Sequence, residues 1–146
     1  MKARTETEVL EFLDEEFAWR RKELSEVCAD VSSAASNARV RAGTTLLYAH
    51  WEGFVKAASE AYVEFVARRR FQYKQLCPGF LALALRTRLN AFARTDDVSA
   101  HVAFVDFILG DLGSHARLPK LGAIKTGANL NSQRLKAIIL TLGLDY

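Results

Sequence analysis

Hydrophobic residues recur along the chain at spacings of three, four and seven residues, which is the pattern of amphipathic helices. The first stripe predicts a helix from about residue 6 to residue 30, and the second predicts a longer helix from about residue 36 to residue 71. Trp51 lies at the centre of the second stripe, so we expect it to be a core residue. The first stripe contains Leu10, Leu13, Phe17 and Leu24, and the second contains Leu47, Trp51, Phe54, Ala58, Tyr62 and Phe65.

Three shorter helices follow a break at Cys77-Pro78-Gly79. The first is expected at residues 80–93, and the second at residues 98–112, after a capping segment Thr95-Asp96-Asp97. The third is expected to begin after a cap at Asn131 or Ser132 and to end at Gly143. Residues 113–131 show no period and are predicted to form a loop. No segment alternates as a strand would. The sequence therefore predicts an all-α helical bundle whose two long helices form an antiparallel pair.

The length of 146 residues fits a single domain over residues 1–146. Half of the residues are hydrophobic and a quarter are charged, which excludes a disordered tail or a fibre. No apolar run approaches the roughly 20 residues of a membrane span, and the N-terminus does not resemble a signal peptide. With only two cysteines and no CxxC pair, we expect a cytoplasmic protein without a membrane partner.

The net charge of +3 conceals a gradient along the chain. Residues 1–30 carry nine acids and five bases, whereas residues 31–94 carry ten bases and three acids. A basic middle segment permits contact with nucleic acid. Many helical proteins that bind no nucleic acid share this asymmetry. Charge alone therefore favours an ordinary solvated surface over a nucleic-acid-binding one.

Several chemistries are excluded by their motifs. The segment GAIKTG (Gly122–Gly127) does not match a phosphate-binding loop, and GxSxG, HExxH and GxGxxG do not occur. The three histidines lie in separate segments without the spacing of metal ligands. We therefore expect neither a metal ion nor a cofactor.

The segment Tyr48–Lys56 (YAHWEGFVK) combines a histidine, a carboxylate and an amine within about two turns of one helix. Glu52 and Lys56 are four residues apart and can pair on one face, whereas His50 lies about 160° around the helix from Glu52. Two interpretations stay open: a reactive cluster, or a solvated ion pair beside a hydrogen-bonded core histidine. Gly53 lies inside the apolar pattern, where close helix packing would explain it.

Three segments of the chain together resemble the HEPN superfamily, specifically its bacterial branch related to the RiboL-PSP and MAE-type HEPN domains. They are FAWRRKELSEV (Phe17–Val27), RAGTTLLYAHWEGFVKAA (Arg41–Ala58) and ANLNSQRLKAIILTLGLD (Ala128–Asp145). The resemblance implies a helical bundle and a metal-independent endoribonuclease, often a toxin of toxin–antitoxin or phage-defence systems. It also implies a homodimer with a shared cleft, RNA as substrate, and an antitoxin or nucleotidyltransferase as a partner.

The superfamily's catalytic signature is an arginine, four to six residues and then a histidine. Histidine can act as general base or acid on the 2′-hydroxyl, and arginine stabilises charge on the phosphate. Arg94 and His101 match this spacing, with Asp96 and Asp97 between them, whereas Arg41 and His50 lie about 180° apart on one helix. Either the catalytic pair lies beyond Tyr146 or it is missing, and we expect little RNA cleavage by this chain.

The resemblance also identifies individual residues. Glu52 and Lys56, with His50 beside them, match the polar positions of the family's long helix. Arg41, Asn129 and Asn131 are candidate RNA contacts, although Asn131 and Ser132 can equally cap a helix. Trp19, Arg20 and Glu23 match the first-helix motif. The alternative to a ribonuclease is a non-catalytic module for helical dimerisation or protein interaction.

Overall fold

The computed structural model describes residues 4–31, 36–119, 122–127 and 129–146. These residues form five α-helices, one short 3₁₀ helix and no strand beyond a single bridge between Gln72 and His115. The helices are α1 (Glu6–Val31), α2 (Asn37–Arg68), α3 (Pro78–Phe92), α4 (Val98–Gly110) and α5 (Ser132–Thr141), and the 3₁₀ helix η1 (Tyr73–Gln75) follows α2. The all-α prediction is confirmed, and the predicted helix bounds agree with the observed ones to within three residues.

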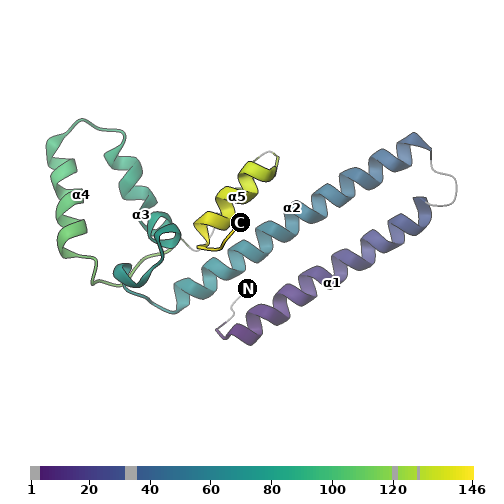
Figure 1. Cartoon of the computed structure of the whole chain (residues 1–146), viewed down its shortest axis with the longest axis horizontal. Helices are drawn as coiled ribbons and strands as arrows, with labels where there is room; N and C mark the ends of the chain where they lie inside the picture. Colours follow the sequence, from purple (N-terminus) through teal and green to yellow (C-terminus); the bar gives the residue numbers. More distant parts are fainter. Residues whose placement is uncertain (1–3, 32–35, 120–121, 128) are drawn as a thin grey trace.

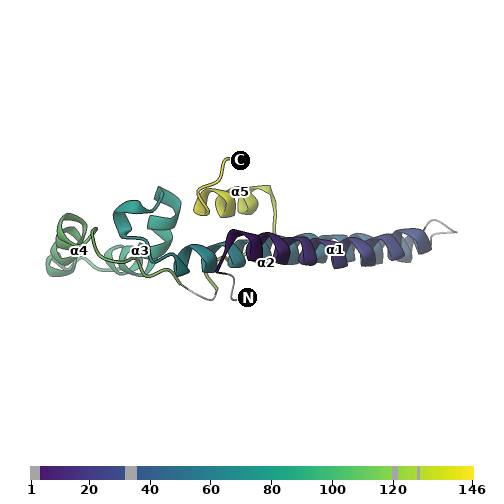
Figure 2. The same cartoon turned by 90° about the horizontal axis from the view of Figure 1, so that it is seen from below.

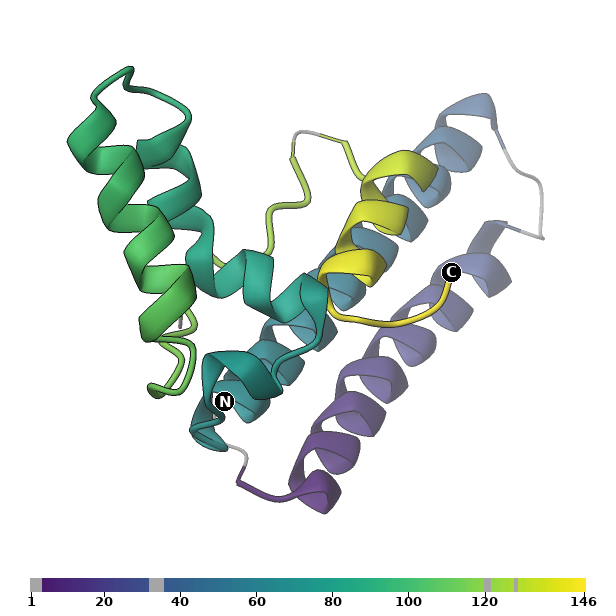
Figure 3. The same cartoon turned by 60° about the vertical axis from the view of Figure 1, so that its left-hand side comes forward.

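The two long helices run antiparallel as a hairpin (Figure 1). Seen from below, α1 and α2 lie in one layer, and α5 lies on one side of it (Figure 2). Helices α3 and α4 form a second antiparallel pair near the end of α2 (Figure 3). The hairpin therefore extends past the other helices at the end where α1 meets α2.

Local capping explains where α1 begins. The Thr5 hydroxyl accepts a hydrogen bond from the Glu8 backbone N–H at 3.2 Å, and the Glu8 carboxylate accepts from the backbone N–H groups of Arg4 and Thr5. This reciprocal arrangement is a capping box. The hydrogen bond from the Arg4 backbone, with the one from Thr5, lowers the pKa of Glu8, so the carboxylate stays charged at the positive end of the helix dipole.

The later helices have the caps that the sequence predicted. Asp97 accepts from the Ser99 backbone N–H and starts α4, and Asn131 Oδ1 accepts from the Arg134 N–H at 2.9 Å and starts α5. The hydrogen bonds from Ser99 lower the pKa of Asp97. After α5, Gly143 adopts a left-handed φ of 68°, and Leu144 N–H reaches back to the carbonyl of Ile139, the geometry of a Schellman motif.

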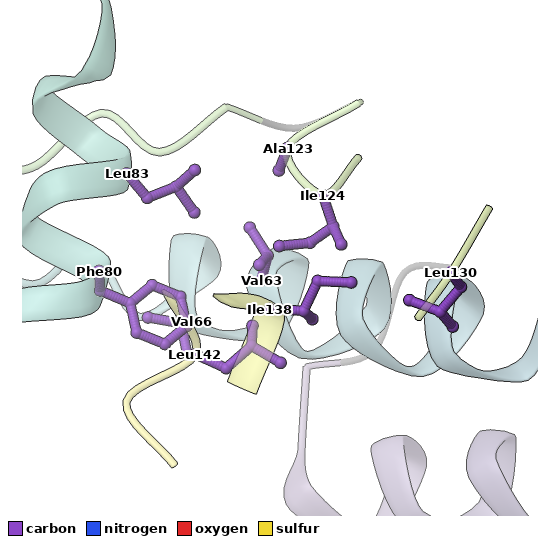
Figure 4. Packing of buried hydrophobic residues seen from close by; sticks show 9 residues of the cluster. All are labelled: Val63, Val66, Phe80, Leu83, Ala123, Ile124, Leu130, Ile138 and Leu142. Atoms are coloured by element: carbon purple, nitrogen blue, oxygen red, sulfur yellow. The ribbon is translucent and has the colours of Figure 1, made fainter. Parts of the chain in front are cut away.

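The main hydrophobic core lies where α2, α3, α5 and the segment before α5 meet (Figure 4). Val63 on α2, only 1% exposed, is the most enclosed of its members. The other buried members are Val66, Phe80, Leu83, Ala123, Ile124, Leu130, Ile138 and Leu142. Thus part of the segment predicted as a loop contributes buried side chains, and α1 contributes none to this cluster.

The prediction that Trp51 is a core residue is wrong. Its side chain is 37% exposed, and its ring meets the edge of Tyr48 at a centroid distance of 5.8 Å. Leu47, at 56% exposed, lies one turn earlier on the same side. The apolar stripe of α2 is broad because it serves two surfaces. One edge packs on α3 and α5, and the other borders α1, where Leu47 and Trp51 line a groove that is open to solvent.

Candidate functional site

The FAWRRKE segment of α1 and the AHWEGF segment of α2 face each other across the hairpin. Phe17 meets Phe54 edge-to-face at 5.9 Å between ring centroids, and Trp19 meets His50 at 5.3 Å. Such aromatic pairs favour this geometry. Two of the three segments that resemble the family therefore form one junction.

Arg20 is at the centre of this junction. Its Nη1 donates to the Glu16 carbonyl at 2.7 Å and to the Glu16 carboxylate at 2.5 Å, and its guanidinium carbon lies 4.3 Å from the centre of the Trp19 ring. A Cβ atom at Gly53 would lie 3.3 Å from Arg20 Nη2, tighter than an ordinary contact. The predicted close packing at Gly53 is therefore confirmed, and the group that approaches it is an arginine.

His50 is enclosed in the same junction. Its side chain is 8% exposed, and its Nε2 atom is buried 3.3 Å from Glu23 Oε2, outside hydrogen-bond geometry. Protonation of the ring would make this contact an ion pair. A substrate cannot reach Nε2 unless the two helices separate, so the position of His50 favours a packing role over acid–base chemistry.

Glu52 and Lys56 do not form an ion pair with each other in the described structure. Glu52 is near Tyr48 and helps to raise the pKa of that phenol. Lys56 is exposed and lines a separate hollow with Glu60 and Lys125. These two side chains, four residues apart, therefore face different surroundings.

The third segment joins the junction through Tyr48. The Tyr48 hydroxyl accepts a hydrogen bond from the Leu130 backbone N–H and donates one to the Leu130 carbonyl at 3.3 Å. Leu130 is only 2% exposed, so this tether holds the segment before α5 against α2. Asn131 caps α5 and Asn129 is exposed, while Ala128, the first residue of the third segment, lies outside the described residues.

We expect Tyr48→Phe to lower the melting temperature by several degrees, because Leu130 then loses both partners of its buried backbone groups. Partial burial, and then the nearby Glu52, raise the pKa of the phenol above its usual value of about 10. A raised folded-state pKa means that the stabilisation is present below pH 10 and is lost as the pH rises through the folded value. Melting curves of wild type and variant should therefore converge at strongly alkaline pH.

The control for this experiment is Tyr146→Phe, because Tyr146 is 69% exposed. It should melt like the wild type at every pH. A difference between wild type and Tyr48→Phe that stays constant to pH 12 would contradict the tether.

Arg94 and His101 lie at the turn between α3 and α4. The His101 Nε2 atom is 2.8 Å from the Thr95 carbonyl oxygen and 3.3 Å from the Phe92 carbonyl oxygen, and its ring stacks on Phe92 at 4.4 Å. Because carbonyls only accept, Nε2 carries the proton, and the ring closes the end of α3. Arg94 is exposed and forms no ion pair within the described chain. Arg41 is likewise exposed, near the start of α2.

A basic hollow that the sequence did not reveal lies among the end of α2, α3, α4 and the segment after α4. It has a volume of about 820 Å³, and Arg70, Arg88, His115 and Arg117 line it. The sequence signal was the HAR triplet at residues 115–117 within the predicted loop. The sequence spacing could not predict that Arg70 and Arg88 lie near this triplet. Their proximity depends on how the α3–α4 pair folds back toward the end of α2.

An apolar groove of about 370 Å³ runs along the hairpin between α1 and α2. Its lining includes Phe17 and Leu24 from α1 and Leu47, Trp51 and Phe54 from α2. Leu10 on α1 lies seven residues before Phe17, and Val40 on α2 lies seven residues before Leu47; both are exposed. The apolar positions of each helix therefore continue at seven-residue spacing. One face of the hairpin is therefore apolar and open.

Comparison with known families agrees with this architecture. The family model described as HEPN_MAE_28990-like HEPN matches residues 9–146, which include nearly all of the hairpin and the later helices. The chain therefore belongs to this family of HEPN domains. No curated protein and no solved structure matches the chain.

No described helix is both long and apolar enough to cross a membrane. No group of three or more histidine, cysteine, aspartate or glutamate side chains gathers there in a way that could hold a metal ion.

Proposed function

We propose that this chain works as a homodimeric HEPN domain that binds RNA in the cytoplasm as part of a toxin–antitoxin or phage-defence system. The observation that carries the dimer is the open apolar face of the hairpin. Leu10 is 61% exposed, Phe17 54%, Val40 48% and Leu47 56%. Large exposed apolar patches usually mark interaction surfaces.

The seven-residue spacing of this face points to its occupant. Residues 10, 17 and 24 on α1 and residues 40, 47 and 54 on α2 repeat with the period of a coiled-coil seam, in which each side chain inserts between residues of a facing helix. A partner must therefore present long helices of equal period. A second copy of the same hairpin does so, and a two-fold pairing would form a four-helix bundle.

The RNA part of the proposal rests on membership of the HEPN family and on the basic residues of the middle segment. An antitoxin or a nucleotidyltransferase is the partner that the family favours. A second candidate function is the family's metal-independent RNA cleavage. The positions of His50 and His101 support binding without efficient cleavage, since one ring is buried between helices and the other is bound to carbonyls.

We expect total RNA to stay largely intact when incubated with the purified protein and a chelator. General acid–base catalysis contributes roughly 10²–10⁴-fold, and neither His50 nor His101 is placed to supply it. Gel analysis of the RNA over time is the measurement, with heat-inactivated protein as the control. Robust cleavage that is lost in His101→Ala would contradict the packing role of that ring and identify Arg94 and His101 as the catalytic pair.

A further inference from the structure

The basic hollow concentrates cationic side chains that have no acidic partner. Arg70 lies in the turn just after α2, Arg88 on α3, and Arg117 in the segment after α4. In the described chain none of these arginines forms an ion pair, although three other arginines pair with glutamates. The only carboxylate that lines the hollow is Asp111. The hollow therefore has an excess of positive charge that an anionic ligand would neutralise.

Arg88 is held in place by a buried aromatic ring. Its guanidinium carbon lies 4.2 Å from the centre of the Phe107 ring, and Phe107 is only 5% exposed. Stacking on the ring engages the face of the guanidinium and leaves its edge N–H groups available to a ligand. Arg88 thus combines a fixed position with free donors.

His115 is fixed by the backbone of the residue across the hollow. Its Nδ1 atom lies 2.6 Å from the carbonyl oxygen of Arg70, which has a left-handed φ of 53°, an uncommon conformation for a residue other than glycine. Because the carbonyl accepts, Nδ1 carries the proton, and Nε2 is the nitrogen left for other contacts.

Backbone hydrogen bonds hold the His115 segment against the residues that link α2 to η1 and against the start of η1. Tyr73 N–H donates to the Ser114 carbonyl at 3.1 Å, and Ala116 N–H donates to the Phe71 carbonyl at 2.8 Å. These bonds lie on either side of His115 in the chain. The histidine and Arg117 therefore lie on an anchored segment, although each is exposed to solvent.

We propose that the basic hollow binds the phosphate group of a nucleotide unit, either free or within single-stranded RNA. Guanidinium forks match phosphate oxygens, and the three arginines of the hollow supply such donors against a single carboxylate, that of Asp111, in the lining. The volume of about 820 Å³ leaves room for a sugar and a base beside the phosphate. The RNA source rests on the proposed function, whereas the phosphate chemistry rests on the hollow itself.

The test uses the full chain and a fluorescein-labelled single-stranded RNA of twelve nucleotides, with binding followed by fluorescence anisotropy at several salt concentrations. AMP and inorganic phosphate serve as competitors. The variant is Arg88→Gln/Arg117→Gln. The matched control is Lys22→Gln/Lys136→Gln, which removes the same charge from exposed positions on α1 and α5. Melting curves confirm that both variants fold.

The hollow variant should lose at least about tenfold in affinity, and its slope of log K against log salt should fall by about 1 for each arginine removed. The control should bind nearly as the wild type does. His115→Asn keeps a donor for the Arg70 carbonyl but removes Nε2, which accepts hydrogen bonds when Nδ1 carries the proton. A sugar hydroxyl beside the phosphate would lose this acceptor, so the variant should weaken binding without lowering the melting temperature. Competition by AMP would show that one nucleotide fills the hollow, whereas binding of RNA alone would show that the polymer is required.

The outcomes separate this inference from the proposed function. Binding of AMP or phosphate, but not of RNA, would support the phosphate site and contradict RNA as the ligand. RNA binding that is unchanged in Arg88→Gln/Arg117→Gln would overturn the phosphate site while leaving the RNA-binding function standing. Absence of binding to any of the three probes would overturn both.

Discussion

Gly79→Ala is expected to destabilise the protein by at least about 1–3 kcal/mol, the usual cost of overpacking a core. A Cβ atom at Gly79 would lie 2.6 Å from the Thr141 carbonyl oxygen and closer still to that of Leu140. Both neighbours are backbone atoms at the end of α5, so they cannot move aside as a flexible side chain could. The measurement is the free energy of unfolding from chemical denaturation.

Gly110→Ala is the matched control for this prediction. Gly110 ends α4, and nothing lies within 4 Å of the position that its Cβ would take. Alanine should therefore be neutral or stabilise the helix by up to about 1 kcal/mol. Equal stability of the Gly79→Ala and Gly110→Ala variants would show that α3 and α5 do not approach as closely as described.

The meeting of α3 and α5 also has an electrostatic basis. Gly79 lies in the first turn of α3, where backbone N–H groups carry partial positive charge, and the carbonyls of Leu140 and Thr141 carry the negative end of α5. A side chain at Gly79 would separate these opposite ends. The Cys77-Pro78-Gly79 break that the sequence revealed is therefore more than a helix boundary, because its glycine allows two helix termini to touch.

The helices themselves could be predicted because their signals are local. Periodicity marks the stripes, and Asn131 and Gly143 satisfy backbone groups within a few residues of themselves. Trp51 could not be placed in the same way. Its spacing identifies the apolar side of α2, but only the tertiary structure shows that α3 and α5 cover one edge of that side and leave Trp51 and Leu47 open.

The candidate site shows the same limit. The motif residues Arg20, His50 and Tyr48 were found from the sequence, but not their surroundings. Arg20 donates to Glu16 within α1, His50 packs between α1 and α2, and only Tyr48 forms hydrogen bonds to the segment before α5. The basic hollow combines Arg70 and His115, which are 45 residues apart and joined by a hydrogen bond to a backbone carbonyl. No spacing rule within one helix describes such a contact.

A single charge in the apolar face of the hairpin should dissociate the proposed dimer. Wild-type protein should scatter light as a dimer at high micromolar concentration. Leu47→Glu should raise the Kd of the dimer roughly thirtyfold or more, since removing a central contact of an interface costs about 2 kcal/mol or more. The variant would place a charge in the middle of the apolar face, where Phe17 and Phe54 line the same groove.

Leu109→Glu provides the control for the dimer. Leu109 is 80% exposed on α4, far in sequence from the hairpin. The variant therefore introduces the same leucine-to-glutamate change at an exposed position outside the proposed interface. It should leave the dimer intact. The melting temperature of the Leu47→Glu monomer should depend little on protein concentration, whereas that of the wild type should rise with it. A wild-type monomer at high micromolar concentration, or dissociation by Leu109→Glu alone, would show that the open face of α1 and α2 is not the surface that pairs.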